Sequence, residues 1–358
     1  MTSPTRLMPL YGGLLAAAVG IFLLIRWYGE TLVAGLPASA APVVGASPAG
    51  DVLPHVLLAL GAVILIGRAL GRLLRPLRQP PVIGEILAGI LLGPSLLGPN
   101  LSSRIIPPDA ASAVGVVAQL GVILFMFIVG LELDLGLLRR RAPTAIVISH
   151  AGIVVPFLLG AATAAIVYPR LATEAVSFTI FALFLGIVMA ITAFPVLARI
   201  LTDQGLERTP LGTLALGIAA VGVVTAWCLL ALVVGLARVE MESGFLIAVG
   251  AFAFIAVMLA VVRPLAARQS RRWPEQLPES VVAAIFIALF ASALVADRIG
   301  IHALFGAFLL GAAMPHDGPL ARFFERRIRL TVTVFLLPAF FAFIGMRTRI
   351  DLVLGVEA

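Results

Sequence analysis

The sequence has little charge, no lysine and one cysteine, and these shortages exclude whole classes of protein. Cys228 is the single cysteine, so an internal disulfide framework is excluded. Charged residues make up only 12% of the 358 residues, whereas 61% are hydrophobic. Such a chain cannot cover its surface with polar groups as a soluble domain does, which indicates that lipid is its solvent.

Motifs of soluble chemistry are also lacking. No phosphate loop, catalytic triad or nucleic-acid motif is apparent. His150, His302 and His316 have neither the mutual spacing nor the acidic partners of a metal site, so we expect structural, hydrogen-bonded histidines. The sequence therefore predicts no cofactor, no metal and no nucleic-acid partner.

The chain does have long apolar runs, each reaching the roughly 20 residues that a helix needs to cross about 30 Å of hydrocarbon. They predict an all-α, polytopic membrane protein with about eleven transmembrane helices. The first run follows Arg6 and is too long and apolar for a signal peptide, so we interpret it as an uncleaved helix. The expected helices lie near 8–28, 52–75, 81–98, 112–135, 142–167, 176–200, 210–236, 243–266, 280–296, 300–316 and 330–346.

All 25 basic residues are arginines, and the formal charge of +7 would also fit an anionic partner. Their placement indicates membrane topology instead. The segments on the side of the N-terminus hold 18 arginines, and the segments on the opposite side hold seven. Because positive residues near helix ends are retained in the cytoplasm, we expect a cytoplasmic N-terminus and a multi-pass protein of the inner (cytoplasmic) cell membrane.

Composition divides the chain into two predicted parts. Residues 1–51 hold an extra transmembrane helix and an outer linker, since 29–50 is rich in Gly, Ala, Pro and Ser. Residues 52–358 form the main membrane domain.

The main domain contains an internal similarity. Segment 87–93 (LAGILLG) resembles 305–311 (FGAFLLG), and segment 125–130 (FMFIVG) resembles 340–345 (FFAFIG). The partners are seven helices apart, so they cross the membrane in opposite directions. This pattern predicts an inverted repeat, which is typical of secondary transporters.

A proline interrupts the sixth expected helix. Pro195 lies inside an apolar segment, where it removes a backbone donor and frees a carbonyl about a turn earlier. In lipid such groups need a partner, and Thr192 is close enough in sequence to provide one. The segment is either a broken helix that faces protein or a wet cavity, or a simple kink.

Five stretches, taken together and in order, resemble bacterial cation/proton antiporters of the Kef-like branch, within the sodium/hydrogen exchanger family. They are 80–98, 120–134, 191–203, 301–311 and 337–348, and the resemblance covers about 52–352. It implies exchange of Na⁺ or K⁺ for protons by alternating access, a dimerisation bundle in a homodimer, and an ion site where two broken helices cross beside one or two buried aspartates. A carboxylate suits this exchange because it binds either a proton or a cation.

The sequence departs from the family pattern at that acidic position. Gly222 and Val223 stand where the resemblance places the aspartate pair, and no acidic residue occurs between Glu207 and Glu240. The inverted repeat would also pair helices three to seven with helices ten to fourteen, so we expect the second repeat to be truncated after two helices.

The remaining polar residues leave three hypotheses open. Glu132 is the best intramembrane carboxylate that is left, whereas Glu85 and Asp134 fall near helix ends, where a solvated charge or a cap is expected. The first hypothesis is a monovalent cation/proton antiporter, inactive or completed by another chain. The second is a transporter-derived enzyme or binder of an apolar small molecule, and the third is a structural or regulatory subunit. The residues that would line the pocket of the second are Thr192, Thr225, Trp227 and Cys228.

Overall fold

The computed structural model describes residues 4–35, 52–133, 142–174, 176–207, 209–238, 241–315, 318–348 and 350. Asp134, His316 and most of the predicted linker lie outside these residues. The described regular structure is helical, which confirms the all-α prediction.

The chain forms the following α-helices: α1 (Pro4–Gly29), α2 (Val52–Leu74), α3 (Pro81–Leu92), α4 (Pro94–Ile105), α5 (Pro108–Glu132), α7 (Ala142–Leu171), α8 (Phe178–Ala190), α9 (Phe194–Asp203), α10 (Pro210–Arg238), α11 (Met241–Val257), α12 (Arg263–Ser270), α13 (Glu279–Ile299), α14 (Ala303–Ala313), α15 (Pro319–Phe323), α16 (Arg329–Thr331) and α17 (Leu337–Met346). Segments Met258–Val262, Phe324–Ile328 and Val332–Leu336 are π-helical. They join their neighbours into longer continuous helices.

Within the described part of the chain, nine helical segments are long and apolar enough to cross a membrane. The protein is therefore a multi-pass membrane protein. Two of the eleven expected spans are shorter: α3 has 12 residues and α14 has 11. That these two also cross the membrane stays a prediction.

The expected helix 81–98 is wrong as a continuous element. The structure ends α3 at Leu92 and begins α4 at Pro94, with Gly93 extended between them (φ −79°, ψ 169°). A proline disfavours helical backbone at the residue before it, so Pro94 forces this corner. Proline fits the first turn of the new helix, where no intrahelical donor is lost.

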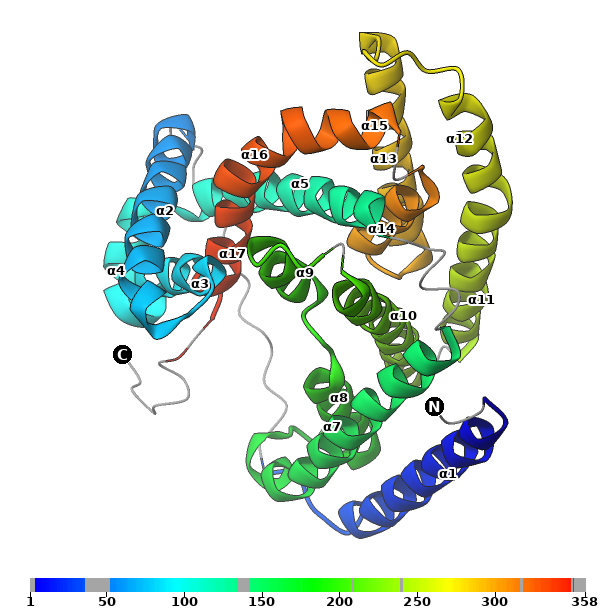
Figure 1. Ribbon diagram of the computed structural model, residues 1–358. Coiled ribbons are helices and arrows are strands. Elements are labelled where there is room, and N and C mark those ends of the chain that lie inside the picture. The colour runs from blue at the N-terminus through cyan, green and yellow to red at the C-terminus, as the bar shows by residue number, and fades with distance from the viewer. Residues whose placement is uncertain are drawn as a thin grey trace.

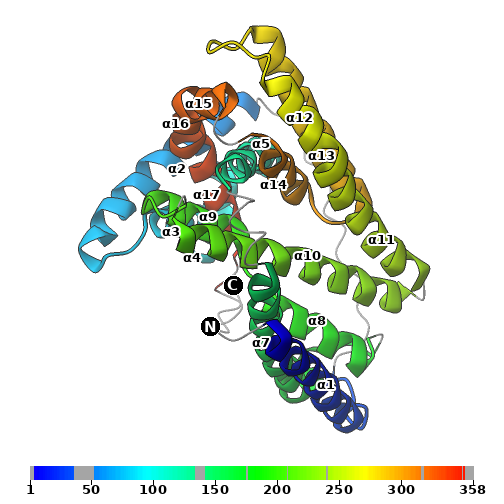
Figure 2. The same ribbon diagram turned by 45° about the vertical axis from the view of Figure 1, so that its right-hand side comes forward.

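The helices gather into two groups, which Figures 1 and 2 show from two directions. In one group α14 lies against α5 and α13, while α17 lies against α3 and α5. In the other, α1, α8 and α10 pack around α7. The short helix α9 contacts α3 and α5 of the first group and α10 of the second, so it joins the two.

The helices α5 and α14 cross at backbone contact. A Cβ added to Gly130 would lie 2.1 Å from the carbonyl oxygen of Phe308, and a Cβ added to Gly311 would lie 2.1 Å from that of Phe127. Each glycine therefore fits against the backbone of the other helix. Small residues that let helices approach this closely are typical of membrane helix interfaces.

The helices α3 and α17 repeat this arrangement. A Cβ on Gly345 would lie 2.2 Å from the carbonyl oxygen of Ile86, and one on Gly89 would lie 2.0 Å from that of Ala342. In the predicted repeat, α3 and α5 correspond to α14 and α17. The second helix of each half thus packs on the first helix of the other half, as two related halves would.

Candidate functional site

The predicted break near Pro195 is present. Helix α8 ends at Ala190 and α9 begins at Phe194, so 191–193 is not helical. Pro195 occupies the first turn of α9, where its missing N–H costs no intrahelical bond. A simple kink is excluded because the chain turns extended at Ile191 (φ −67°, ψ 118°).

The three residues of the break are exposed in the isolated chain. At Thr192 the hydrogen bond is made by the backbone carbonyl, which accepts from the N–H of Phe194 at 2.9 Å. The expected role of the Thr192 hydroxyl as partner for a freed carbonyl is not observed, because the backbone has left the helix and the side chain is exposed. Polar backbone within a membrane span must face protein or water, so the backbone groups of this break need a partner of one of these two kinds.

The position where the family resemblance implies the first aspartate has one close neighbour outside its own helix. Gly222 lies on α10, and a Cβ added there would have one neighbour within 4 Å, the hydroxyl oxygen of Ser149 at 3.2 Å. That hydroxyl is buried and has no hydrogen-bond partner among the described residues. A buried donor without an acceptor is costly, and a carboxylate at 222 would provide the acceptor. Val223, by contrast, packs against the main hydrophobic core.

A chain of hydrogen bonds lies one turn further along α10. The hydroxyl of Thr225 donates to the carbonyl of Val221 at 2.9 Å, so its oxygen is left to accept from Nε2 of His150 at 3.2 Å. The other ring nitrogen, Nδ1, then accepts from the hydroxyl of Tyr11 at 2.9 Å. These bonds suit a neutral His150 with its proton on Nε2, and they link α1, α7 and α10.

Trp227 and Cys228 point elsewhere. The indole ring of Trp227 packs on the imidazole of His302, with 5.2 Å between ring centroids, and Cys228 packs against the main core. His302 itself caps α14, since its Nδ1 accepts from the N–H of Leu304 at 3.3 Å. The structure therefore groups Gly222 and Thr225 with Ser149 and His150, and it does not bring Trp227 into that group.

Glu132 is not a solitary carboxylate. Its Oε1 pairs with one nitrogen of Arg329, whose other terminal nitrogen lies 2.8 Å from Oε1 of Glu207. The Glu132 side chain is 5% exposed and that of Glu207 is 9% exposed. One guanidinium thus holds two buried carboxylates, from α5 and from the turn before α10.

A second arginine repeats the pattern. Arg199 on α9 lies 3.0 Å from Asp203 and 3.6 Å from Glu85, and it donates to the backbone carbonyl of Thr333 at 3.3 Å. The expectation that Glu85 is solvated or a cap is wrong, because the residue is 6% exposed. It is buried because α3 turns this side chain toward α9 and packs it against Gly67 of α2.

We call these six residues the arginine–carboxylate network: Glu85, Glu132, Arg199, Asp203, Glu207 and Arg329. Four carboxylates share two guanidinium groups across α3, α5, α9, α16 and the turn before α10. In the sequence both arginines indicate only topology. The signal that could have found the network is their position inside apolar spans, where charged side chains are rare and usually paired.

Residues 61–357 match the family described as "Sodium/hydrogen exchanger, transmembrane". The chain belongs to this family. It is 39% identical over 306 residues to "Na(+)/H(+) antiporter NhaS4" of Synechocystis, which covers 83% of this chain and 75% of that protein. It is also 39% identical over 320 residues to "Cation/H(+) antiporter 17" of Arabidopsis thaliana, with 88% of this chain and 39% of the relative covered. "K(+)/H(+) antiporter 1" of Saccharomyces cerevisiae is 30% identical over 296 residues, with 77% and 33% covered.

Membership of the exchanger family confirms the resemblance seen in the sequence. The finer assignment to the Kef-like branch stays a prediction. The exchanger-family chain spans about two fifths of the length of the Arabidopsis relative and three quarters of the Synechocystis relative.

Proposed function

We propose that this exchanger-family chain is a membrane transport protein of the monovalent cation/proton antiporter type. The observation that carries the proposal is the broken helix α8–α9 packed beside α10, in a chain that matches the family over residues 61–357. The names of the relatives, which mention cation, sodium and potassium exchange for protons, support the same class.

The proposed transport scaffold lacks its coupling group. A buried carboxylate exchanges a proton for a cation because both compete for one negative charge. Gly222 and Val223 carry no charge at that position, and the nearest polar groups, Ser149, His150 and Thr225, are neutral in the hydrogen-bonding pattern described above. We therefore propose that the chain on its own does not couple the two ions, and that an acid supplied at 222 or by a second chain is required.

Proton flux in proteoliposomes tests this proposal. The Gly222→Asp, Val223→Asp variant is expected to collapse a pH gradient when Na⁺ or K⁺ is added, whereas the unaltered chain is not. Equal flux in both proteins would place the coupling group elsewhere. If neither protein shows flux, even with a candidate partner chain present, the scaffold is not that of an antiporter.

Topology and assembly are part of the proposal. The excess of arginine on one side supports a cytoplasmic N-terminus in the inner cell membrane, and the family resemblance supports a homodimer. We also propose that residues 1–51 are an addition to the exchanger domain of residues 52–358. Limited proteolysis of inside-out and right-side-out vesicles would determine the orientation.

The apolar-ligand alternative gains little from the contacts observed. Two of its proposed lining residues, Trp227 and Cys228, are engaged by His302 and by the hydrophobic core. A structural or regulatory subunit stays a prediction, which a purified protein that is monomeric in mild detergent would contradict.

A further inference from the structure

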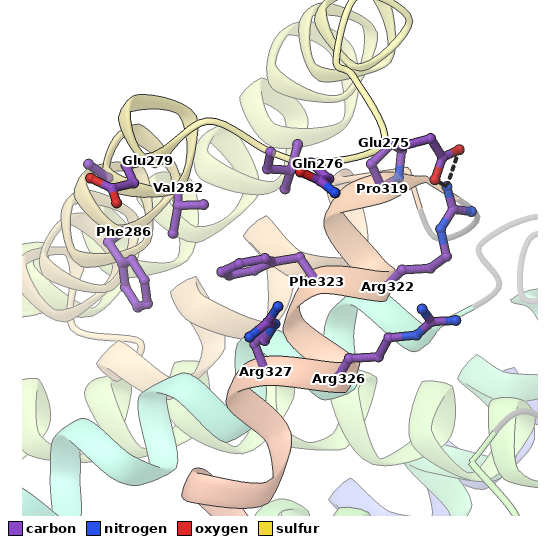
Figure 3. A pocket seen from close by; sticks show the side chains of 12 residues that line it. Glu275, Gln276, Glu279, Val282, Phe286, Pro319, Arg322, Phe323, Arg326 and Arg327 are labelled. Carbon is purple, nitrogen blue, oxygen red and sulfur yellow. Dashed lines mark hydrogen bonds and ion pairs between the residues drawn. The ribbon is translucent and has the colours of Figure 1, made fainter.

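A groove with arginines on one wall lies between the start of α13 and the helix that begins with α15. It has a volume of about 820 Å³. We call it the arginine groove, and Figure 3 shows its lining. The side chains that matter here are Glu275, Val282, Phe286, Arg322, Phe323, Arg326 and Arg327.

The arginine groove lies at a membrane boundary. Its two walls are the first turns of two apolar segments long enough to span a bilayer, Glu279–Ile299 and Pro319–Met346. The segment 271–278 that leads into it is polar, with two arginines at its start. A ligand in this groove would therefore have one end at the level of lipid head groups and the other beside hydrocarbon.

The positive charge of the groove is only partly neutralised. Arg322 forms a two-pronged ion pair with Glu275, with both nitrogen–oxygen distances at 3.0 Å. Arg326 and Arg327 are exposed and form no ion pair within the described part of the chain. The one further carboxylate in the lining, Glu279, lies on the opposite wall (Figure 3). Two guanidinium groups thus remain available to an anion.

The arginine groove is also apolar. Val282 and Phe286 line the α13 wall, and Phe323 lies one turn before Arg327 on the other wall. Figure 3 shows Arg327 extending beside the ring of Phe323, while Arg322 and Arg326 extend together in the opposite direction, away from that ring. A surface that combines free guanidinium groups with aromatic and aliphatic side chains fits an amphiphile better than it fits a small soluble anion.

We propose that the arginine groove binds an anionic phospholipid, with the head-group phosphate on Arg327, the positive charge of Arg326 nearby, and an acyl chain along Val282 and Phe286. Arginine matches phosphate oxygens with two parallel hydrogen bonds. Basic pockets between membrane helices on the cytoplasmic side are suited to acidic head groups. This site is separate from the helix break and from Gly222, so it does not depend on the proposed transport activity.

Lipid titration with a matched pair of variants tests the proposal. Phosphatidylglycerol is added to the full chain in uncharged detergent, and binding is followed by the shift in thermal unfolding. The test variant is Arg326→Gln, Arg327→Gln. The control is Arg271→Gln, Arg272→Gln, which removes the same charge from an exposed neighbouring segment outside the groove. We expect the dissociation constant to rise roughly 30-fold in the test variant, the equivalent of about 1 kcal/mol per arginine, and to change much less in the control.

Other ligands and one further variant decide the remaining points. Phosphatidylcholine and soluble glycerol phosphate are expected to give no shift, and Phe286→Ala is expected to weaken binding of a long-chain lipid more than that of a short-chain one. The proposal is overturned if phosphatidylglycerol gives no shift, if glycerol phosphate or phosphatidylcholine matches it, or if both arginine pairs weaken binding equally. Circular dichroism and the elution volume show that each variant is folded.

Discussion

Replacing Arg329 by glutamine should destabilise the protein far more than removing an exposed arginine does. Its guanidinium holds two carboxylates, Glu132 and Glu207, whose side chains are 5% and 9% exposed. Removing one partner of a buried ion pair leaves an uncompensated charge and costs about 3–5 kcal/mol. Since two carboxylates lose their partner, we expect the upper part of that range.

The comparison pair for this prediction is exposed. Arg322 and Glu275 also form an ion pair, but their side chains are 42% and 83% exposed. Solvent screens such a pair, so Arg322→Gln should cost about 0–1 kcal/mol. The free energy of unfolding of both variants can be measured by denaturant titration in mixed micelles.

A triple variant separates charge from packing. Combining Arg329→Met with Glu132→Gln and Glu207→Gln removes the buried charges together, so most of the lost stability should return. An Arg329→Gln variant that loses no more stability than Arg322→Gln would rule out this role of Arg329, and so would a triple variant that is less stable than Arg329→Gln alone.

Two further changes test the packing of the fold. Gly130→Ala should destabilise the chain by about 1–3 kcal/mol, because its Cβ would meet a backbone oxygen at 2.1 Å. Gly152→Ala, whose Cβ would have nothing within 4 Å, should leave the stability unchanged. Thermal unfolding compares the two variants, and equal effects would contradict the close crossing of α5 and α14. Tyr11→Phe should lower the free energy of unfolding by about 0.5–1.5 kcal/mol, because the hydrogen bond to His150 is lost. A double-mutant cycle with His150→Phe that shows no coupling energy would contradict this hydrogen bond.

The sequence predicts most of the membrane architecture because apolar length, proline and arginine placement are local signals. The break is predictable since Pro195 stands inside an apolar run. The corner at Gly93 is not predicted, because the hydrophobic run of 81–98 continues across it as it would in one helix. Pro94 nevertheless gives the same kind of local signal as Pro195. The crossing of Gly130 and Gly311 is not predicted by the sequence, because the close approach of α5 and α14 depends on how the two helices pack.

The candidate site is predictable only in part. The resemblance to a family pattern predicts that Gly222 and Val223 stand at the positions of the acidic pair. Their neighbours cannot be found this way, since Ser149 is 73 residues away in sequence and its contact depends on how α7 packs on α10. Likewise, Glu85 looks like a helix-end charge until α9 places Arg199 against it.

We propose that this exchanger-family chain does not couple cation and proton movement because position 222 carries no carboxylate. Cation-dependent proton flux should be measured in proteoliposomes for Gly222→Asp and for Gly222→Asn, which has the same shape without the charge. We expect flux for the aspartate variant alone, reduced when Ser149→Ala removes the hydroxyl 3.2 Å from the new Cβ. Flux of equal size in the asparagine variant or in the unaltered chain would contradict it, and so would the absence of flux in a folded aspartate variant.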